Sequence, residues 1–485
     1  MSTGTSRRAL VDEARATVAS FDLEGLKALG LLPLTDLFFP AIYYPPLTMY
    51  PKAEAEDALA GLEWKNHDRT CLYVHIPQCP SRCTYCHWVV SLSSSPADID
   101  RYLDHLEKEM DLWKAKLGGG AIFPSSVLIG GGTPTILSAP QMKRFMKMLA
   151  SRFDLSRCAQ FTVEAEPATL LGPAGLDKLK VLKDFGVDRI SMGVQSFDDK
   201  VLKYMARPHD AAEAVEAIAQ IRRAGIGSLS IDLIYGFPDC TAERWAETLE
   251  IAASMDIDAY QLYRLRIVPH GDKVGAIKSR HEKAPDVFPS LEQTYVMKAL
   301  GKLVSERRGF GENLRRIFSR SPRHISFYLR DYGCRLNDNL GLGVSSWSSL
   351  GDRFLMNTGS SLKAYYAAVA AGRLPVDRGL VRSADDERRR ALVLPLKSYG
   401  VSKERYRERT GTSLESAFGP RLRLLEEHGL VEQDSVKLAL TAKGGFFADE
   451  TVMQFYAPSY LPFPRSSYAE GALNPHSHEA AALAG

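Results

Sequence analysis

Three cysteines lie close together in the stretch HIPQCPSRCTYCHW, residues 75–88, with the spacing C-x3-C-x2-C. They are Cys79, Cys83 and Cys86. Zinc sites usually need four Cys or His ligands, and disulfide frameworks need an even number of cysteines. Closely spaced thiolates bind soft metals, and three of them can hold a [4Fe–4S] cube whose fourth iron keeps an open position. The spacing therefore favours an iron–sulfur cluster.

Two other interpretations of the three cysteines stay open at this point. One is a structural zinc ion with a distant fourth ligand, for which His75 and His87 are nearby candidates. The other is three unrelated buried thiols. The remaining cysteines have no such pattern and are predicted to be reduced, mostly buried thiols. They are Cys71, Cys158, Cys240 and Cys334.

Composition narrows the class of protein. Of the 485 residues, 45% are hydrophobic and 25% are charged, which is ordinary for a globular protein. A net charge of +3 gives no argument for a nucleic-acid partner. No apolar stretch is long enough to predict a membrane span, and the first residues lack the apolar region of a signal peptide. A cytoplasmic enzyme with no nucleic-acid or membrane partner is expected.

From about residue 70, short apolar runs alternate with helix-length amphipathic runs about six times. This rhythm predicts a parallel sheet that curls into a partial (β/α)6 barrel, an α/β fold. The expected strands are TCLYVHI (70–76), SSVLIGG (125–131), QFTVEAE (160–166), DRISMGV (188–194), SLSIDLIYG (228–236) and DAYQLYRLRI (258–267). The loops that follow such strands share one face, where chemistry belongs. The cysteines follow the first expected strand, and GGGTPT (130–135) follows the second.

The rest of the chain is predicted to flank this barrel. A Pro- and Tyr-rich segment, residues 31–51, should wrap as irregular structure over another surface. A C-terminal pattern of helices and a short hairpin is typical of a winged helix, which we interpret as a lid or packing module. The predicted parts are an N-terminal extension (1–69), the barrel (70–310), a connecting region (311–375), the winged-helix-like module (376–458) and a flexible tail (459–485).

The cysteine motif, with Tyr85 just before its last cysteine, resembles that of the radical S-adenosylmethionine (SAM) superfamily. The flanking motifs occur in the order found in oxygen-independent coproporphyrinogen III oxidase and its HemN-like relatives. They are LYVHIPQC, GGGTPT, VEAEP, RISMGVQSF, SIDLIYGFP, GLGVSS and the closing LTAKGGFFADETVMQF. The resemblance covers about residues 70–460, and we identify the chain as similar to this family.

This resemblance implies a [4Fe–4S] cluster whose open iron is chelated by SAM. One electron then cleaves SAM and leaves a 5′-deoxyadenosyl radical, so an electron donor such as flavodoxin or ferredoxin and a small-molecule substrate are implied. HemN-like enzymes can hold a second SAM. By position, contacts to the cluster-bound SAM match Tyr73, Gly131 and Glu164. Contacts to the second match Tyr85, Gly132, Thr133, Gln195, Arg207 and Asp232.

Physical chemistry suggests a role for several of these residues. Gly130–Gly132 would let the backbone approach SAM closely, since no Cβ intervenes. Glu164 could accept hydrogen bonds from SAM or could be a surface acid, and its neighbour Glu166 is predicted to be a surface acid. Arg207 could pair with a SAM carboxylate, and a structural ion pair between Arg207 and Asp232 is the alternative.

The sequence departs from the oxidases on the expected substrate side. Trp88 stands where they typically carry a fourth cysteine, Arg266 where they have a small residue, and Gln78 where Phe is common. The sequence alone therefore favours a HemN-like C-methyltransferase or cyclopropanase of specialised metabolism that uses two SAM. The alternatives are an oxygen-independent coproporphyrinogen III oxidase and a heme-binding or heme-trafficking chaperone.

Overall fold

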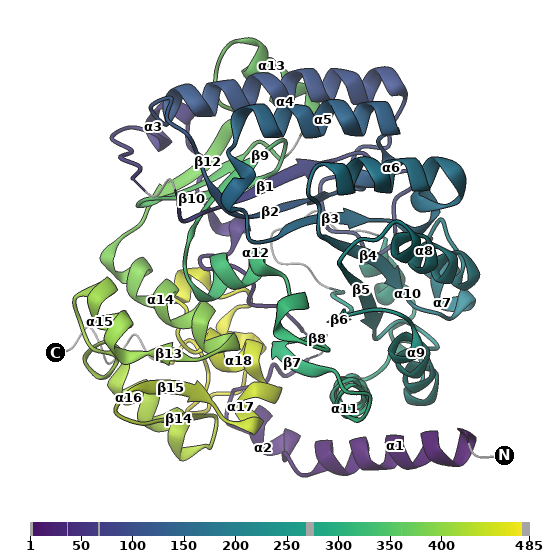
Figure 1. The fold of residues 1–485 in the computed structure, drawn as a ribbon. Coiled ribbons are helices and arrows are strands. Elements are labelled where there is room, and N and C mark those ends of the chain that lie inside the picture. The colour runs from purple at the N-terminus through teal and green to yellow at the C-terminus, as the bar shows by residue number, and fades with distance from the viewer. Residues whose placement is uncertain (1–2, 36, 66–67, 268–275, 360, 478–485) are drawn as a thin grey trace.

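A computed structural model describes residues 3–35, 37–65, 68–267, 276–359 and 361–477 (Figure 1). In this part of the chain no helix is long and apolar enough to cross a membrane.

Six neighbouring parallel strands form the centre of the molecule, and their positions confirm the predicted strands. They are β1 (Thr70–Ile76), β2 (Pro124–Gly131), β3 (Phe161–Ala165), β4 (Arg189–Gln195), β5 (Ser228–Tyr235) and β6 (Ala259–Arg264). Each strand is mostly buried, as expected where helices cover one face and a packed interior the other.

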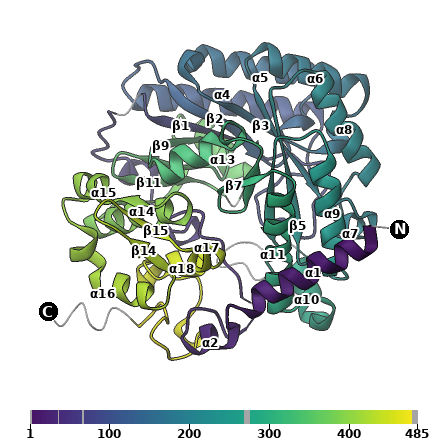
Figure 2. The same cartoon turned by 60° about the horizontal axis from the view of Figure 1, so that its bottom comes forward.

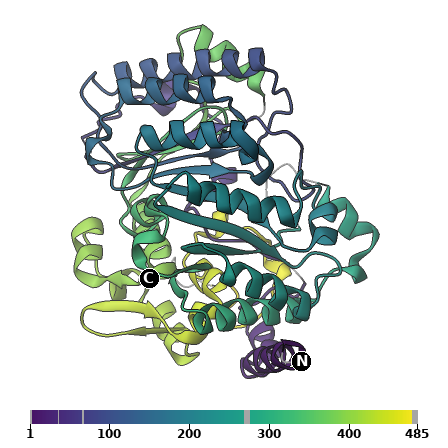
Figure 3. The same cartoon turned by 45° about the vertical axis from the view of Figure 1, so that its right-hand side comes forward.

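Helices connect these strands and form a layer outside them, as Figure 3 shows. They are α4 (Pro96–Lys116), α5 (Ala139–Arg152), α6 (Gly172–Asp184), α7 (Asp199–Tyr204), α8 (Ala211–Arg223), α9 (Ala242–Ser254) and α11 (Leu291–Arg307). Several begin at a side-chain cap that satisfies free N–H groups of the first turn. Ser138 and Gln141 form a reciprocal capping box on α5, and Asp210 and Glu213 form one on α8.

The barrel stays open because further strands continue the sheet at both edges. At one edge β9 (Asp338–Leu342) pairs parallel to β1, and β10 (Trp347–Leu350), β11 (Arg353–Asn357) and β12 (Val376–Val381) follow antiparallel. At the other edge β8 (Ile317–Ser319) pairs antiparallel with β6, and β7 (Gly311–Leu314) follows it. The described strands thus form one 12-stranded mixed sheet, which confirms a partial barrel.

The N-terminal extension consists of a helical part, which packs on the outside of the barrel, and an irregular part, which lies over its interior. Its first helix, α1 (Thr3–Ala19), packs against α9 and α11 (Figure 2). Helix α2 (Leu23–Ala28) follows it. Residues 37–46 then form no helix or strand and lie over the interior of the sheet, where several of them line a cavity. The segment expected to wrap over another surface does so, and we call residues 37–48 the strap.

The C-terminal region folds as predicted, with helices around a small sheet. Helices α14 (Ala384–Ser398), α15 (Lys403–Thr410) and α16 (Leu414–Glu427) surround strands β13 (Val401–Ser402), β15 (Lys437–Leu440) and β14 (Val431–Gln433). Helices α17 (Ala442–Phe446) and α18 (Ala448–Met453) lead back toward the barrel. This region lies at the lower left of Figure 1.

The flexible tail predicted for 459–485 is wrong as far as residue 477. Leu461, Phe463, Tyr468 and Leu473 are buried, and the Leu473 N–H donates to the Leu29 carbonyl at 2.7 Å. The Pro- and Ser-rich composition suggested a loose end, but its spaced apolar side chains find an apolar surface to cover. Residues 478–485 lie outside the described part.

A buried ion pair joins the strap to the C-terminal region. Lys397 on α14 pairs with Asp449 on α18, and both are at least nine-tenths buried. Lys397 also donates to the Ala41 carbonyl at 2.9 Å, and the Ala41 N–H donates to Asp449 at 2.8 Å. Burial lowers the pKa of Lys397 to about 8, while the adjacent Lys397 charge holds the pKa of Asp449 below its usual value against the effect of burial. The Lys397–Asp449 ion pair and its bonds to Ala41 therefore hold the strap, α14 and α18 together.

Replacing Lys397 by Met should destabilise the protein by about 3 kcal/mol, because the Asp449 carboxylate then stays buried without its partner. Urea unfolding midpoints would measure this, with the exposed Lys116→Met as the matched control. The double variant Lys397→Met/Asp449→Leu should recover part of the loss, since no charge is then stranded. Equal midpoints for Lys397→Met and Lys116→Met would contradict the anchoring role.

Candidate active site

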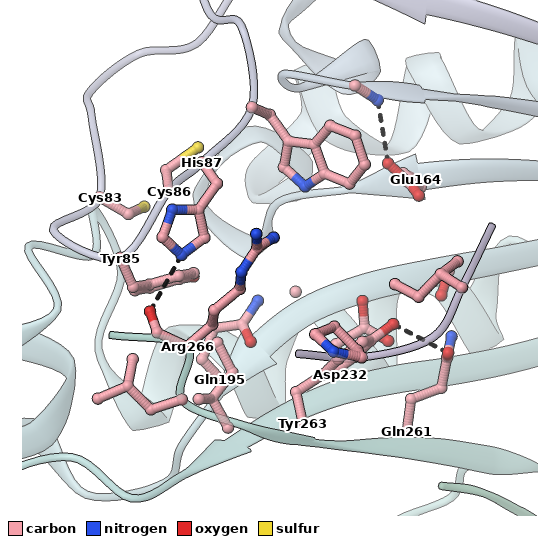
Figure 4. Close-up of a pocket in the computed structure, with 18 of the residues that line it drawn as sticks. Cys83, Tyr85, Cys86, His87, Glu164, Gln195, Asp232, Gln261, Tyr263 and Arg266 are labelled. Carbon is pink, nitrogen blue, oxygen red and sulfur yellow. Dashed lines mark hydrogen bonds between the residues drawn. The ribbon is translucent and has the colours of Figure 1, made fainter. Parts of the chain in front are cut away.

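A single cavity of about 510 Å³ at the carboxyl ends of β1–β6 collects the residues predicted from sequence. All of them line it: Tyr73, Cys79, Cys83, Tyr85, Cys86, Gly131, Gly132, Thr133, Glu164, Gln195, Arg207 and Asp232. Figure 4 shows Cys83, Tyr85 and Cys86 on one side and Asp232, Gln261 and Tyr263 on the other. The volume falls within the range of small-molecule sites.

The cysteine loop is fixed by its own backbone and by neighbouring elements. The Cys79 N–H donates to the Ser91 carbonyl at 2.9 Å, and the Thr84 N–H donates to the Met205 carbonyl at 3.0 Å. All three cysteines are free thiols, and burial raises the pKa of Cys79 to about 11. A metal that binds here must displace these protons, which thiophilic metals do.

The zinc alternative finds little support in this geometry. His75 is buried, with Tyr73 Oη donating to its Nδ1 at 3.0 Å and its Nε2 facing the Val89 carbonyl at 3.1 Å. His87 uses Nε2 on the Arg266 carbonyl at 3.0 Å. Among the described residues, no three His, Cys, Asp or Glu side chains are placed to share one metal ion. A cube binds its thiolates through separate irons, so the three thiols fit a cluster better than a single ion.

Gly130, Gly131 and Gly132 are needed for a reason other than the predicted one. A Cβ on Gly131, whose φ is +111°, would lie 2.5 Å from His75 Nδ1. A Cβ on Gly132 would lie 2.6 Å from the Pro77 carbonyl oxygen, and one on Gly130 would lie 2.5 Å from the Glu164 carboxylate. The missing side chains thus first allow the loop to pack against β1 and β3, and this packing places Gly131 and Gly132 at the cavity.

Glu164 is held by this same loop, since the Gly131 N–H donates to Glu164 Oε2 at 3.1 Å. Its carboxylate lines the cavity, and burial raises its pKa. Glu164 is therefore not a surface acid.

Arg207 is bound within the protein more tightly than the sequence suggested. Its Nη1 donates to Cys83 Sγ at 3.2 Å and to Tyr85 Oη at 3.3 Å. Its Nη2 donates to the Gly193 carbonyl at 2.6 Å and pairs with Glu166 at 3.5 Å. Only Nε lacks a partner among the described residues. A two-point contact with an incoming carboxylate would therefore require Arg207 to give up existing bonds.

The ion pair considered between Arg207 and Asp232 is not the one that forms, and Glu166 is not a surface acid. Glu166 is 5% exposed and also contacts His209 Nδ1 at 2.6 Å. His209 Nε2 lies 3.1 Å from the Val194 carbonyl, which can only accept, so Nε2 carries a proton. Glu166 therefore connects His209 to Arg207 beside the cavity, a contact that the sequence did not reveal.

Asp232 and Gln195 complete the floor of the cavity. Burial raises the pKa of Asp232 to about 7, and its Oδ1 has no hydrogen-bond partner among the described residues. Gln195 ends β4 in a left-handed conformation with φ of 70°, and its buried Oε1 is likewise without a described partner. Unpartnered polar atoms and a strained backbone at a cavity are typical of ligand-binding positions.

The sequence did not predict several other residues that line the cavity. Some come from the strap and from α18, namely Phe38, Phe39, Tyr43, Asp449 and Glu450. Others are cations on or near β6, α11 and β8, namely Arg264, Lys298 and Arg316. Trp88 and Arg266, the two departures noted above, line the same cavity. These residues lie hundreds of positions apart in places, so no local motif could have joined them.

Comparison with known proteins identifies two family models and several relatives that match this chain. The radical SAM superfamily model matches residues 73–252, and the HemN C-terminal domain model matches residues 383–447. The heme chaperone HemW of Bacillus subtilis is 30% identical over 393 residues, which cover 79% of this chain and 98% of HemW. The oxygen-independent coproporphyrinogen III oxidase of Escherichia coli is 29% identical over 399 residues, 79% of this chain and 84% of the oxidase.

A solved structure shows the same fold. Coproporphyrinogen III oxidase (HemN) from Escherichia coli, described as a radical SAM enzyme, superposes with a TM-score of 0.69 at 28% identity. The match covers 82% of this chain and 92% of that chain.

Changing Cys79, Cys83 and Cys86 singly to Ser should each abolish a cluster of about four irons and four sulfides after anaerobic reconstitution. Iron and sulfide assays and the visible absorption of the cluster would measure this. Cys158→Ser, outside the cavity, is the matched control and should load normally. One tightly bound zinc ion without sulfide in the unaltered protein would contradict the cluster.

Asp232→Asn should change how stability depends on pH. The folded protein holds the Asp232 proton up to about pH 7, whereas the unfolded chain releases it near pH 4. The wild-type protein therefore loses stability through this group as the pH rises from about 4 to 7. The variant lacks this loss, so it should gain about 2 kcal/mol relative to wild type between pH 5 and pH 8. Urea midpoints at both pH values test this, and a difference that does not vary with pH would refute it.

Proposed function

We propose that this chain, which belongs to the oxygen-independent coproporphyrinogen III oxidase-like (HemN-like) family of the radical SAM superfamily, oxidises a carboxylate-bearing tetrapyrrole. Coproporphyrinogen III is the first candidate, through oxidative decarboxylation of its propionate groups. The relatives reported above are named for coproporphyrinogen III or for heme, and both are tetrapyrroles with propionate side chains. None of these relatives is named a methyltransferase, so the preference drawn from Trp88 and Arg266 is not carried into the proposal.

The shape and charge of the cavity are the main support. Thiols lie on one side, and an aromatic and cationic wall surrounds the rest, including Phe38, Phe39 and Tyr43 from the strap. Arg316 stacks on the Tyr263 ring at 4.9 Å, and Tyr263 lies across the pocket from Cys83 and Cys86 in Figure 4. Among the described residues, no hydrogen bond or ion pair joins the Arg316 guanidinium to a carboxylate, so it remains available to an anion in the cavity.

The balance of charge in the cavity favours an anionic substrate. Among the described residues that line it, seven are Lys or Arg and five are Asp or Glu. Burial raises the pKa of Glu164, Asp232 and Glu450, which weakens the negative charge of these acids near neutral pH. Another of the five, Glu166, is already paired with Arg207. The remaining positive charge can recognise propionate carboxylates, and the rings can pack on the macrocycle.

Each part of the chain has a separate task in this reaction. When bound, a reduced [4Fe–4S] cluster with SAM supplies a carbon-centred radical that can remove a hydrogen atom from a propionate side chain. Cys79, Cys83 and Cys86 would hold the cluster, and Glu164 with Gly131 would orient SAM. The strap and α18 close the far side and limit the access of water. Loss of carbon dioxide then leaves a vinyl group and one electron, which a one-electron acceptor must take up.

A heme-handling role is the second candidate, and one comparison favours it. The relative named heme chaperone HemW is aligned over 98% of its own length. In this role the same cavity would bind heme by its propionates without turning it over.

Anaerobic incubation with coproporphyrinogen III, SAM and a reductant should release carbon dioxide together with 5′-deoxyadenosine and no S-adenosylhomocysteine. Arg316→Gln should raise the KM for the tetrapyrrole about 10-fold or more, because one charge-assisted contact is lost. Its SAM cleavage without substrate should stay unchanged. Arg320→Gln is the matched control, since Arg320 bonds to the Ile257 and Ala253 carbonyls outside the cavity.

Other outcomes of this experiment decide between the candidates. S-adenosylhomocysteine in amounts similar to 5′-deoxyadenosine would show methyl transfer instead of decarboxylation. Tight binding of heme with no conversion of coproporphyrinogen III would favour the chaperone role.

A further inference from the structure

The outer side of the cysteine loop is covered by two short helices, α7 and α10 (Ile277–Lys283). Thr84 lies between Cys83 and Cys86 and contacts both helices. Its N–H donates to the Met205 carbonyl at 3.0 Å, and its hydroxyl donates to the Tyr204 carbonyl at 3.3 Å. The Ile277 N–H donates to the Thr84 carbonyl at 3.0 Å. The surface of α7 and α10 is therefore directly connected to the loop that would hold the cluster.

This surface carries several exposed cations without ion-pair partners. We call them the basic face, and they are Lys200 and Lys203 on α7, Arg280 and Lys283 on α10, and Arg82 on the adjoining cysteine loop, where it also borders the cavity. In the described part of the chain none of the five forms an ion pair, although Arg280 donates to the Tyr204 carbonyl at 3.0 Å and stacks on the Tyr204 ring. The neighbouring Lys278 is the one cation here that pairs, with Glu282 at 3.7 Å.

Some arginines elsewhere on the barrel are paired with acids, although exposed lysines of α4 and α5 such as Lys108 and Lys143 form no ion pair with a described residue. On the outer face of α5, Arg144 and Arg152 are each paired with carboxylates of α4, among them Asp104 and Asp111. Exposed charges that are not neutralised in this way extend a field into the solvent and attract partners of opposite sign. Their position over the cysteine loop sets the basic face apart from the other lysines of the surface.

We propose that the basic face docks a small acidic protein that carries one electron to the cluster. This inference rests on the proposed function only through the cluster and its reduction, not through the choice of tetrapyrrole. One electron leaves the reduced carrier and enters the cluster, and no atoms are exchanged. Redox encounters of this kind use small, transient interfaces, in which opposite charges raise the rate of association. A neutral or basic carrier would gain nothing from five unpaired cations.

The test compares two electron donors on the full chain with its reconstituted cluster. Reduced flavodoxin, an acidic protein, probes the basic face, and photoreduced 5-deazaflavin is a small uncharged donor that does not need to dock. The rate of cluster bleaching is followed anaerobically by absorbance. The variant Lys200→Glu/Lys203→Glu/Lys283→Glu reverses three charges whose side chains form no hydrogen bond or ion pair with a described residue. The control Lys108→Glu/Lys116→Glu/Lys143→Glu reverses three exposed lysines on α4 and α5.

Charge reversal on the basic face should slow reduction by flavodoxin about 10-fold or more at low salt, because steering of the carrier is lost. The difference should shrink as salt rises toward 1 M, where charges are screened within a few ångströms. Reduction by deazaflavin should be equal in all three proteins. Equal flavodoxin rates in both charge-reversed proteins, or no salt dependence in wild type, would overturn the proposal.

Two further readouts separate this inference from a folding defect and from the proposed function. If the triple variant binds less iron than wild type, the single variant Lys203→Gln is used in its place. The salt dependence of flavodoxin reduction in the wild-type protein then still tests the docking. Slower reduction by deazaflavin as well would show a structural effect and overturn the docking role. Failure of any protein to form a cluster would refute the proposed function itself, whatever the surface does.

Discussion

The contact between His75 on β1 and Gly131 at the end of β2 holds the active-site loops in place. The His75 ring accepts from Tyr73 at Nδ1 and donates to the Val89 carbonyl from Nε2, and burial lowers its pKa to about 4. The ring is therefore neutral and fixed. The end of β2 can pass over it only without a side chain at position 131. Because Val89 follows the cysteines, this one ring joins the cysteine loop to the glycine loop.

The contacts of Arg207 form a second set that links the cysteine loop to β3 and β4 across the cavity. Arg207 bridges Cys83 and Tyr85 on the cysteine loop to Gly193 on β4 and Glu166 after β3. Four of its N–H contacts are made before any ligand enters, so the radical-generating side is organised in advance. The side around Arg316 differs, because this guanidinium stacks on the Tyr263 ring, forms no ion pair with a described residue and lines the cavity. Arg207 and the residues that it contacts are fixed, whereas the Arg316 charge is available to a ligand. This difference fits a site in which one group of residues holds the cofactor and another selects the substrate.

The central fold could be predicted from the sequence because the signals for its strands and helices lie within short stretches of the chain. Apolar runs at strand spacing, and helices that begin at Ser138 or Asp210, are determined within a few residues. The cofactor residues predicted from the motifs do line one cavity, since they lie in or after strands whose carboxyl ends meet at one edge. The strap, the acids of α18 and the cations around Arg316 were not predicted. The pairing of Arg207 with Glu166 instead of Asp232 was not predicted, because charge alone does not say which of several nearby acids a guanidinium will reach. The packed tail was missed for a related reason, since Leu473 finds its partner Leu29 across most of the chain.

The strap, which helps to close the cavity, lies outside the motifs by which the family is recognised, whereas α18 lies within the last of them. The strap meets α18 through Ala41 and Asp449, which are 408 positions apart, and Lys397 binds both. Aromatic rings of the strap and the acids of α18 then line the same cavity as the thiols. Conserving the motif chemistry therefore does not determine what the cavity accepts. A family of this architecture can keep one way of generating a radical and change its substrate through the strap, α18 and the cations around Arg316, because none of them holds the cluster loop.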